Sequence, residues 1–312
     1  MLRSKRLNRF GLHSGRARIS HELAGRRRRR LAKSISSDDR AQFDGLGYIQ
    51  VENFLPPDDF LRLRDKIFAH EAPARDMVQG NTVTRRFAVD AAYEKAVPEI
   101  LKLLRTPRWK GLMRYVSSFN VEPLYYIQVI LPHRKKGPDD PQTALHSDTF
   151  HPTMKAWFFL HDVADDEGPF QYVPGSHRLT PERIAWEKRK SLTDVGKLDR
   201  LSQKGSMRIE PRELAELSLP PPQRFAVPAN TLVVADTCGF HGRCPSSKSA
   251  RRVEIWAYSR RNPFLPWTGL DIFSLPGIAS RRIGALWFAR DKLRKYLGQP
   301  WRKGGKKTPM SD

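Results

Sequence analysis

The chain has 312 residues, 39% of them apolar, and a formal net charge of +23 at pH 7. This length can bury a substantial core in one domain, and no run of 18 apolar residues is present, so no membrane-spanning helix is expected. Two cysteines are too few for a disulfide framework, and the N-terminal arginines lead into no apolar stretch. We therefore expect a cytoplasmic protein in a reducing compartment.

The positive charge lies mainly at the two ends of the chain. Residues 1–40 hold 13 Lys and Arg against 3 Asp and Glu, and residues 264–312 hold 10 against 3. This division predicts a basic, flexible N-terminal arm over 1–40, a globular domain over 41–263, and a basic helical extension over 264–312. Such ends suit nucleic acid or anionic lipid surfaces, and charge alone does not choose between them.

The first half of the domain is predicted to be mainly helical. A short strand is expected at about 47–51, followed by a helix that starts near Pro56 and Pro57. A second helical region covers about 94–115, and Pro107 interrupts its pattern.

From residue 123 onward the sequence changes to short β-rich runs separated by Pro, Gly, Asp and Asn. These runs are 124–131, 154–163, 170–173, 224–227, 230–236 and 252–259. Their number and spacing predict a sandwich or jelly roll, so the fold class is mainly β with flanking helices. Residues 179–219 form a charged, helix-prone insertion between strands, and residues 278–297 predict a basic terminal helix.

The stretch LHSDTFHP, at 145–152, holds the first candidate metal ligands. Alternate side chains of a strand share a face, so His146 and Asp148 can point together into the mouth of the barrel. A third ligand must come from elsewhere, and His241, which follows the strand at 230–236, is the candidate. Two histidines and a carboxylate are the facial set of non-haem iron(II) oxygenases, although zinc hydrolases also use such sets.

Arg252 lies eleven residues beyond His241, on the predicted strand at 252–259. A guanidinium binds a carboxylate bidentately, which suits the distal carboxylate of a 2-oxo acid that chelates iron. Its neighbour Arg251 is expected to face the opposite side of the strand. The metal set and Arg252 together favour a 2-oxo acid site.

From about Phe43 to Asn262 the chain resembles the phytanoyl-CoA dioxygenase family of Fe(II)/2-oxoglutarate oxygenases. Four ordered features carry the resemblance: FDGLGYIQVENFL from Phe43, HSD at 146–148, the span from Trp157 to Gly168 that leads into VPGSH, and His241 followed by Arg252. The resemblance implies a double-stranded β-helix core of the jelly-roll, cupin-like kind. It also implies Fe(II) as the metal, with 2-oxoglutarate and O₂ as cosubstrates.

The same resemblance implies roles for individual residues. The iron ligands would be His146, Asp148 and His241. Arg252 would hold the distal carboxylate of 2-oxoglutarate, and Trp157 and Gln128 would lie near the cosubstrate. Because halogenating members of the family lack the carboxylate that Asp148 supplies, the resemblance implies hydroxylation.

Other residues near these motifs have competing interpretations. The family usually reads Gly-Ser-Gly-x-Asn-x-Ser after its distal histidine, whereas this chain has Arg243 there, which either turns outward or adds charge to the substrate mouth. His151 is expected to face away from the metal. Cys238 and Cys244 flank His241 at zinc-like spacing, but no second pair completes a zinc site.

We therefore expect a hydroxylase that acts on an anionic substrate, either a small molecule or a lipid-linked one such as a lipopolysaccharide precursor sugar or an acyl-CoA. The amphipathic pattern of 278–297 favours peripheral contact with the anionic inner face of the membrane. One alternative is a basic nucleic-acid-binding protein on a cupin-like scaffold, which the scarcity of aromatic residues in the ends disfavours. The other is a catalytically silent metal-binding sensor, which the intact candidate residues disfavour.

Overall fold

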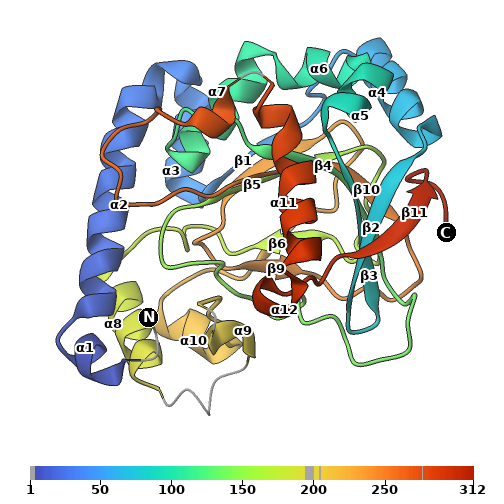
Figure 1. Ribbon diagram of the computed structural model, residues 1–312. Helices are drawn as coiled ribbons and strands as arrows, with labels where there is room; N and C mark the ends of the chain where they lie inside the picture. The colour runs from blue at the N-terminus through green and yellow to red at the C-terminus, as the bar shows by residue number, and fades with distance from the viewer. Residues whose placement is uncertain (1–3, 194–199, 204, 276) are drawn as a thin grey trace.

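The computed structural model describes residues 4–193, 200–203, 205–275 and 277–312. Two antiparallel sheets form the core, and helices cover the outside (Figure 1). The large sheet has eight strands in the order β1-β8-β5-β10-β4-β3-β2-β11, and the small sheet has three in the order β7-β6-β9. The predicted fold class, a jelly-roll core with flanking helices, is confirmed.

The bounds of the elements are as follows. The large sheet contains β1 (Tyr48–Val51), β2 (Ala72–Gln79), β3 (Thr82–Ala88), β4 (Leu124–Leu131), β5 (Met154–Phe159), β8 (Leu232–Asp236), β10 (Arg252–Ser259) and β11 (Arg302–Lys307). The small sheet contains β6 (Phe170–Tyr172), β7 (Gln223–Arg224) and β9 (His241–Arg243). The helices are α1 (Lys5–Arg9), α2 (Leu12–Leu31), α3 (Ser37–Leu46), α4 (Pro57–Ala69), α5 (Ala91–Ala96), α6 (Pro98–Leu104), α7 (Pro107–Ser117), α8 (Pro181–Leu192), α9 (Arg200–Gln203), α10 (Pro211–Glu216), α11 (Arg282–Lys292) and α12 (Arg294–Leu297).

Most expected elements are found near their predicted positions. Pro57 opens α4, and Pro107 ends the preceding helical pattern by opening α7 behind the cap of Thr106. The expected strand at 224–227 is wrong in extent, because β7 ends at Arg224. The hairpin of β2 and β3 and the terminal strand β11 were missed, because their many charged residues hide the alternation that marks a strand.

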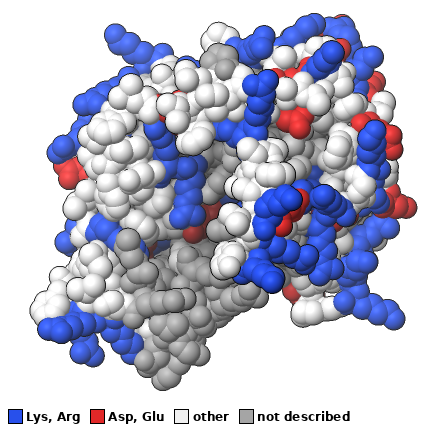
Figure 2. Space-filling view, viewed as in Figure 1, with Lys and Arg blue, Asp and Glu red and all other residues white. Residues whose placement is uncertain are grey.

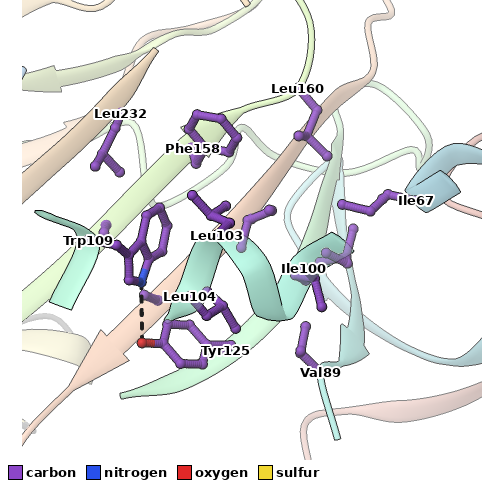
Figure 3. Close-up of a cluster of buried hydrophobic side chains, with 14 of the residues drawn as sticks. Ile67, Val89, Ile100, Leu103, Leu104, Trp109, Tyr125, Phe158, Leu160 and Leu232 are labelled. Atoms are coloured by element: carbon purple, nitrogen blue, oxygen red, sulfur yellow. Dashed lines mark hydrogen bonds between the residues drawn. The ribbon is translucent and has the colours of Figure 1, made fainter. Parts of the chain in front are cut away.

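Strand β5 shows how the large sheet separates two apolar clusters. Ala156 and Phe158 pack on the side of helices α4 to α7, where Trp109 donates a hydrogen bond to the Tyr125 hydroxyl at 3.3 Å (Figure 3). Trp157, between them in sequence, points into a second cluster between the two sheets. The period of two along the strand therefore gives one face to the core and the other to the space between the sheets.

The N-terminal residues, expected to be a flexible arm, form helices that pack on the domain. Helix α2 runs along one side of the molecule (Figure 1). The Arg27 side chain in it is 1% exposed and donates hydrogen bonds to the carbonyl oxygens of Ser118, Pro263 and Leu265. Arg28 donates to Asp236 at 2.8 Å. The arginine run is ordered because it finds buried acceptors far along the chain.

The C-terminal extension contains the expected helix and an additional strand. Ile283 of α11 is buried, and Trp287 packs against the cluster between the sheets, so part of the apolar side of this helix covers the domain. Phe288 on the same helix is 65% exposed. Strand β11 extends the large sheet by pairing with β2. Among the described residues, no helix combines the length and hydropathy that crossing a membrane requires.

Candidate metal centre and cosubstrate cavity

Backbone pairing places the two predicted histidine ligands side by side. The amide of His146 donates to the carbonyl of His241 at 2.9 Å, and the amide of His241 donates back to His146 at 2.9 Å. The amide of Asp148 donates to Thr237 at 2.9 Å, which holds the carboxylate beside them. Residues almost one hundred positions apart are thus joined by the same kind of bonds that build a sheet.

The three side chains turn toward one another. Asp148 Oδ1 lies 4.0 Å from His146 Nε2, and Asp148 Oδ2 lies 3.7 Å from His241 Nε2. One possible ligand atom from each residue lies within 4.8 Å of the others, and this is the only such cluster among the described residues. The separations leave room for an ion to draw the three side chains together.

The ring nitrogens are arranged as a metal ligand requires. Nδ1 of His146 lies 2.8 Å from the carbonyl oxygen of Ala144, and Nδ1 of His241 lies 2.9 Å from that of Gly239. Each Nδ1–H therefore donates to the backbone, and the Nε2 lone pair faces the cluster. His241 Nε2 is buried and has no hydrogen-bond partner among the described residues. A metal ion would satisfy this atom.

Burial sets the charge states of the cluster. It lowers the pKa of His241 to about 4, and burial followed by repulsion from His241 holds the pKa of His146 well below its ordinary value. Burial alone would raise the pKa of the Asp148 carboxyl, but Lys155 and the histidines together lower it. Two neutral imidazoles and one carboxylate are present at neutral pH, which is the protonation state that metal binding needs.

Lys155 is a close neighbour of the cluster that the sequence did not indicate. Its Nζ lies 2.7 Å from Asp148 Oδ2, and its side chain is 18% exposed. It stands two positions before Trp157 on β5, so both side chains face the same space. The alternation of the strand was the available signal.

A cavity of about 470 Å³ opens beside the cluster. Arg252, Trp157 and Gln128, the three predicted cosubstrate residues, all line it. Trp157 stacks on Phe170 with 4.1 Å between the ring centroids. The structure therefore brings all six predicted site residues to one cavity.

A buried polar row fixes Arg252 and Gln128 within this cavity. Arg252 Nε donates to Glu254 at 3.0 Å, and Arg252 Nη1 donates to the carbonyl of Gly168. Gln128 donates to the other oxygen of Glu254 at 2.6 Å and accepts from Arg86 Nε at 2.8 Å. Glu254 is 0% exposed, so its charge is balanced by this row rather than by water. Glu254 and Arg86 were missed by sequence reasoning.

Arg243 lines the cavity and does not turn outward. Its guanidinium is held by an ion pair with Asp140. Among the described residues that line the cavity, seven are basic and one, Asp148, is acidic. The basic residues are Arg86, Lys155, Arg208, Arg243, Arg252, Arg260 and Arg290. Arg243 thus adds charge to a cavity that is already strongly positive.

The other residues considered as metal ligands, His151, Cys238 and Cys244, lie outside the cluster of His146, Asp148 and His241. The His151 Nδ1 atom is 3.0 Å from the carbonyl oxygen of Pro152, and burial lowers the pKa of this residue to about 4. Cys238 and Cys244 are free and buried. Burial raises the pKa of both thiols, and Cys238 directs its sulfur toward the carbonyl of His177.

The chain is similar to several solved structures. The epimerase SnoN, solved with Fe³⁺, alpha ketoglutarate and nogalamycin RO, is 21% identical, with a TM-score of 0.47 over 77% of this chain and 90% of that chain. HygX from Streptomyces hygroscopicus, solved with nickel, 2-oxoglutarate and hygromycin B, is 16% identical, with a TM-score of 0.45 over 72% and 86%. The carbocyclase SnoK from nogalamycin biosynthesis is 17% identical, with a TM-score of 0.44 over 73% and 84%. No curated protein sequence matches.

The family model described as phytanoyl-CoA dioxygenase matches residues 43–212, which is more than half of the chain. The match includes His146 and Asp148 and ends before His241 and Arg252, which the structure brings to the same cavity. The expectation of an iron- and 2-oxoglutarate-dependent enzyme agrees with this family and with a site built to hold a metal. The chain belongs to the phytanoyl-CoA dioxygenase family.

Proposed function

We propose that this protein is a hydroxylase that inserts oxygen into a C–H bond of an anionic substrate. In this proposal the iron ligands are His146, Asp148 and His241. Bound Fe(II) and 2-oxoglutarate would supply the activation of O₂. Arg252 grips the distal carboxylate of 2-oxoglutarate, and Trp157 and Gln128 shape the wall beside it.

The positive charge of the cavity is the observation that supports an anionic substrate. Three of its seven basic side chains have carboxylate partners in the protein, since Arg252 contacts Glu254, Arg243 contacts Asp140 and Lys155 contacts Asp148. Asp148 and a bound 2-oxoglutarate would together carry three negative charges, and the metal would return two positive ones. Positive charge therefore remains in excess, which favours a substrate with carboxylate or phosphate groups.

We propose further that the substrate is lipid-linked, such as a lipopolysaccharide precursor sugar or an acyl-CoA, and that the protein meets it at an anionic membrane surface. Support comes from the C-terminal segment. Eleven of the eighteen exposed large apolar side chains in the described part of the chain lie between Phe264 and Tyr296. Figure 2 shows Lys and Arg side chains gathered beside the C-terminal end of α11. Exposed apolar and basic residues together suit the interface of an anionic bilayer.

The test of the proposed activity uses the purified protein, Fe(II) and 2-oxoglutarate. Slow succinate formation without added substrate is expected, and alanine at His146, Asp148 or His241 should abolish it and lower iron affinity by more than about 100-fold. Arg26→Ala, which changes an exposed residue of α2, is the control and should retain full turnover. Succinate formation that survives Asp148→Ala would refute the ligand assignment, and tight zinc binding without iron activity would favour a hydrolase or a structural site.

A further inference from the structure

A second cavity of about 780 Å³ lies next to the first. The two cavities share part of their walls, formed by Leu124, Tyr258, Arg260 and Leu286. Its outer wall is built by the C-terminal segment, through Phe273 in the 3₁₀ turn Ile272–Ser274 and through the start of α11. This segment lies beyond the residues that the family model matches.

The surface that this second cavity offers is mainly apolar. Phe273 is 55% exposed, Ile278 is 42% exposed and Leu286 is 40% exposed. All three line the cavity, together with Val121 and Ala285. Side chains of this size remain in contact with water here, so covering them with an apolar group would be favourable.

Three charged residues of the second cavity, Arg261, Asp271 and Arg282, have partners within the protein. Arg261 donates to the carbonyls of Gly269 and Leu270, at 2.6 and 2.9 Å. Arg282 donates to the carbonyls of Glu122 and Pro123, at 3.0 and 2.7 Å. The Asp271 carboxylate accepts from Phe273 and Ser274 within its own turn. An apolar ligand would therefore not strip these groups of their hydrogen bonds.

We propose that the second cavity binds the apolar chain of an amphiphilic anionic substrate whose charged group lies among the basic residues of the first cavity. This assignment rests on the proposed function. The continuity of the two cavities supports it, because the shared wall joins the basic residues of the first cavity to the apolar side chains of Phe273, Ile278 and Ala285 in the second. A chain that leaves the first cavity passes between Tyr258 and Leu286 and meets Phe273 and Ile278.

The experiment compares butyl, octyl and dodecyl phosphate, each below its micelle concentration. Binding is measured by calorimetry on protein loaded with Fe(II) and 2-oxoglutarate in the absence of O₂. If the chain is buried as proposed, affinity should rise about two- to fourfold for each added methylene group that enters the cavity. Ala285→Phe, which places a ring in the second cavity, should remove this dependence and leave butyl phosphate binding in place.

Two further variants keep the test decisive. Ile278→Ser removes apolar surface without adding bulk and should reduce the dependence on chain length if Ala285→Phe fails to fold. Phe288→Ala is the matched control, because Phe288 is exposed on the same helix and lines neither cavity. Affinity that does not depend on chain length, or a dependence that Phe288→Ala removes equally, would overturn the assignment. Succinate formation without substrate reports separately on the proposed activity.

Discussion

Adjacent residues of the chain can serve entirely different purposes, and Arg251, just before β10, and Arg252, its first residue, illustrate this. Arg252 is 4% exposed and faces the cavity, where Glu254 and the carbonyl of Gly168 orient its guanidinium. Arg251 faces the other side and pairs with the Asp312 carboxylate at 2.8 Å. The opposite orientations follow from the extended backbone that leads into β10, since successive side chains of extended chain alternate between its two sides.

The first prediction concerns this pair. Arg252→Lys should raise the KM for 2-oxoglutarate by about tenfold or more, because a point charge cannot keep both internal hydrogen bonds and also bind a carboxylate bidentately. The measurement is succinate formation at varied 2-oxoglutarate. Arg251→Lys is the control and should change the KM by less than about twofold, since exposed pairs contribute little. Equal effects from the two variants would contradict the assigned faces.

At the scale of elements, helix α2 acts as a strap that joins distant segments. Arg27 links it to the end of α7 and to residues 263–265, and Arg28 links it to Asp236. Asp236 in turn accepts hydrogen bonds from the amides of Thr153 and Cys238. Thr153 follows Asp148 in the chain, and Cys238 precedes His241. The strap therefore supports the segments that position the candidate metal ligands.

The second prediction tests this strap. Arg27→Lys should lower the free energy of unfolding by about 2–4 kcal/mol, because lysine keeps the charge but cannot reach all the buried acceptors. Arg26→Lys should change it by less than about 0.5 kcal/mol, since Arg26 is exposed and pairs with Glu22 one turn away. Urea denaturation of the two variants provides the comparison. Similar stabilities would show that α2 does not depend on Arg27.

At the scale of the whole molecule, the charge is distributed differently from what the composition alone indicates. Part of the N-terminal arginine run is buried against the domain, whereas the C-terminal segment combines basic and exposed apolar side chains on its surface (Figure 2). Contact with an anionic surface is therefore expected through the C-terminal segment.

The third prediction is that the protein co-sediments with vesicles containing phosphatidylglycerol and that salt weakens the binding, because each basic residue near such a surface contributes about 1 kcal/mol. Phe288→Ser combined with Tyr296→Ser should reduce binding, since both side chains are highly exposed in this segment. Leu61→Ser, on α4, is the matched control. Absence of binding at low salt, or preferential binding to RNA, would contradict the membrane proposal.

The predicted site residues were accessible to sequence reasoning because their signals are local or ordered along the chain. His146 and Asp148 form one motif, and His241 and Arg252 follow in a fixed order. Glu254 and Arg86 were inaccessible because their roles depend on strand register. Both lie opposite Gln128, one on β10 and one on β3, so the polar row exists only after β3, β4 and β10 have paired.

The same reasoning explains which elements were missed. The strands of the β-rich region could be predicted because their apolar residues alternate along the sequence. The packing of α2 on the domain depends instead on hydrogen-bond acceptors of Arg27 that lie more than 90 positions away. Strand β11 is rich in lysine and glycine and is ordered by pairing with β2. Local sequence carries no signal for partners of this kind.

The strap formed by α2 also has a consequence for how the protein folds. Two of the acceptors that Arg27 contacts, the carbonyls of Pro263 and Leu265, lie 236 and 238 positions later in the chain. Closing so long a loop delays the contact, because local structure forms faster than pairing over large sequence separations. The buried arginine therefore completes its set of hydrogen bonds only after residues 263–265 have been synthesised. Docking of α2 is expected to be a late folding step, one that follows assembly of the sheets.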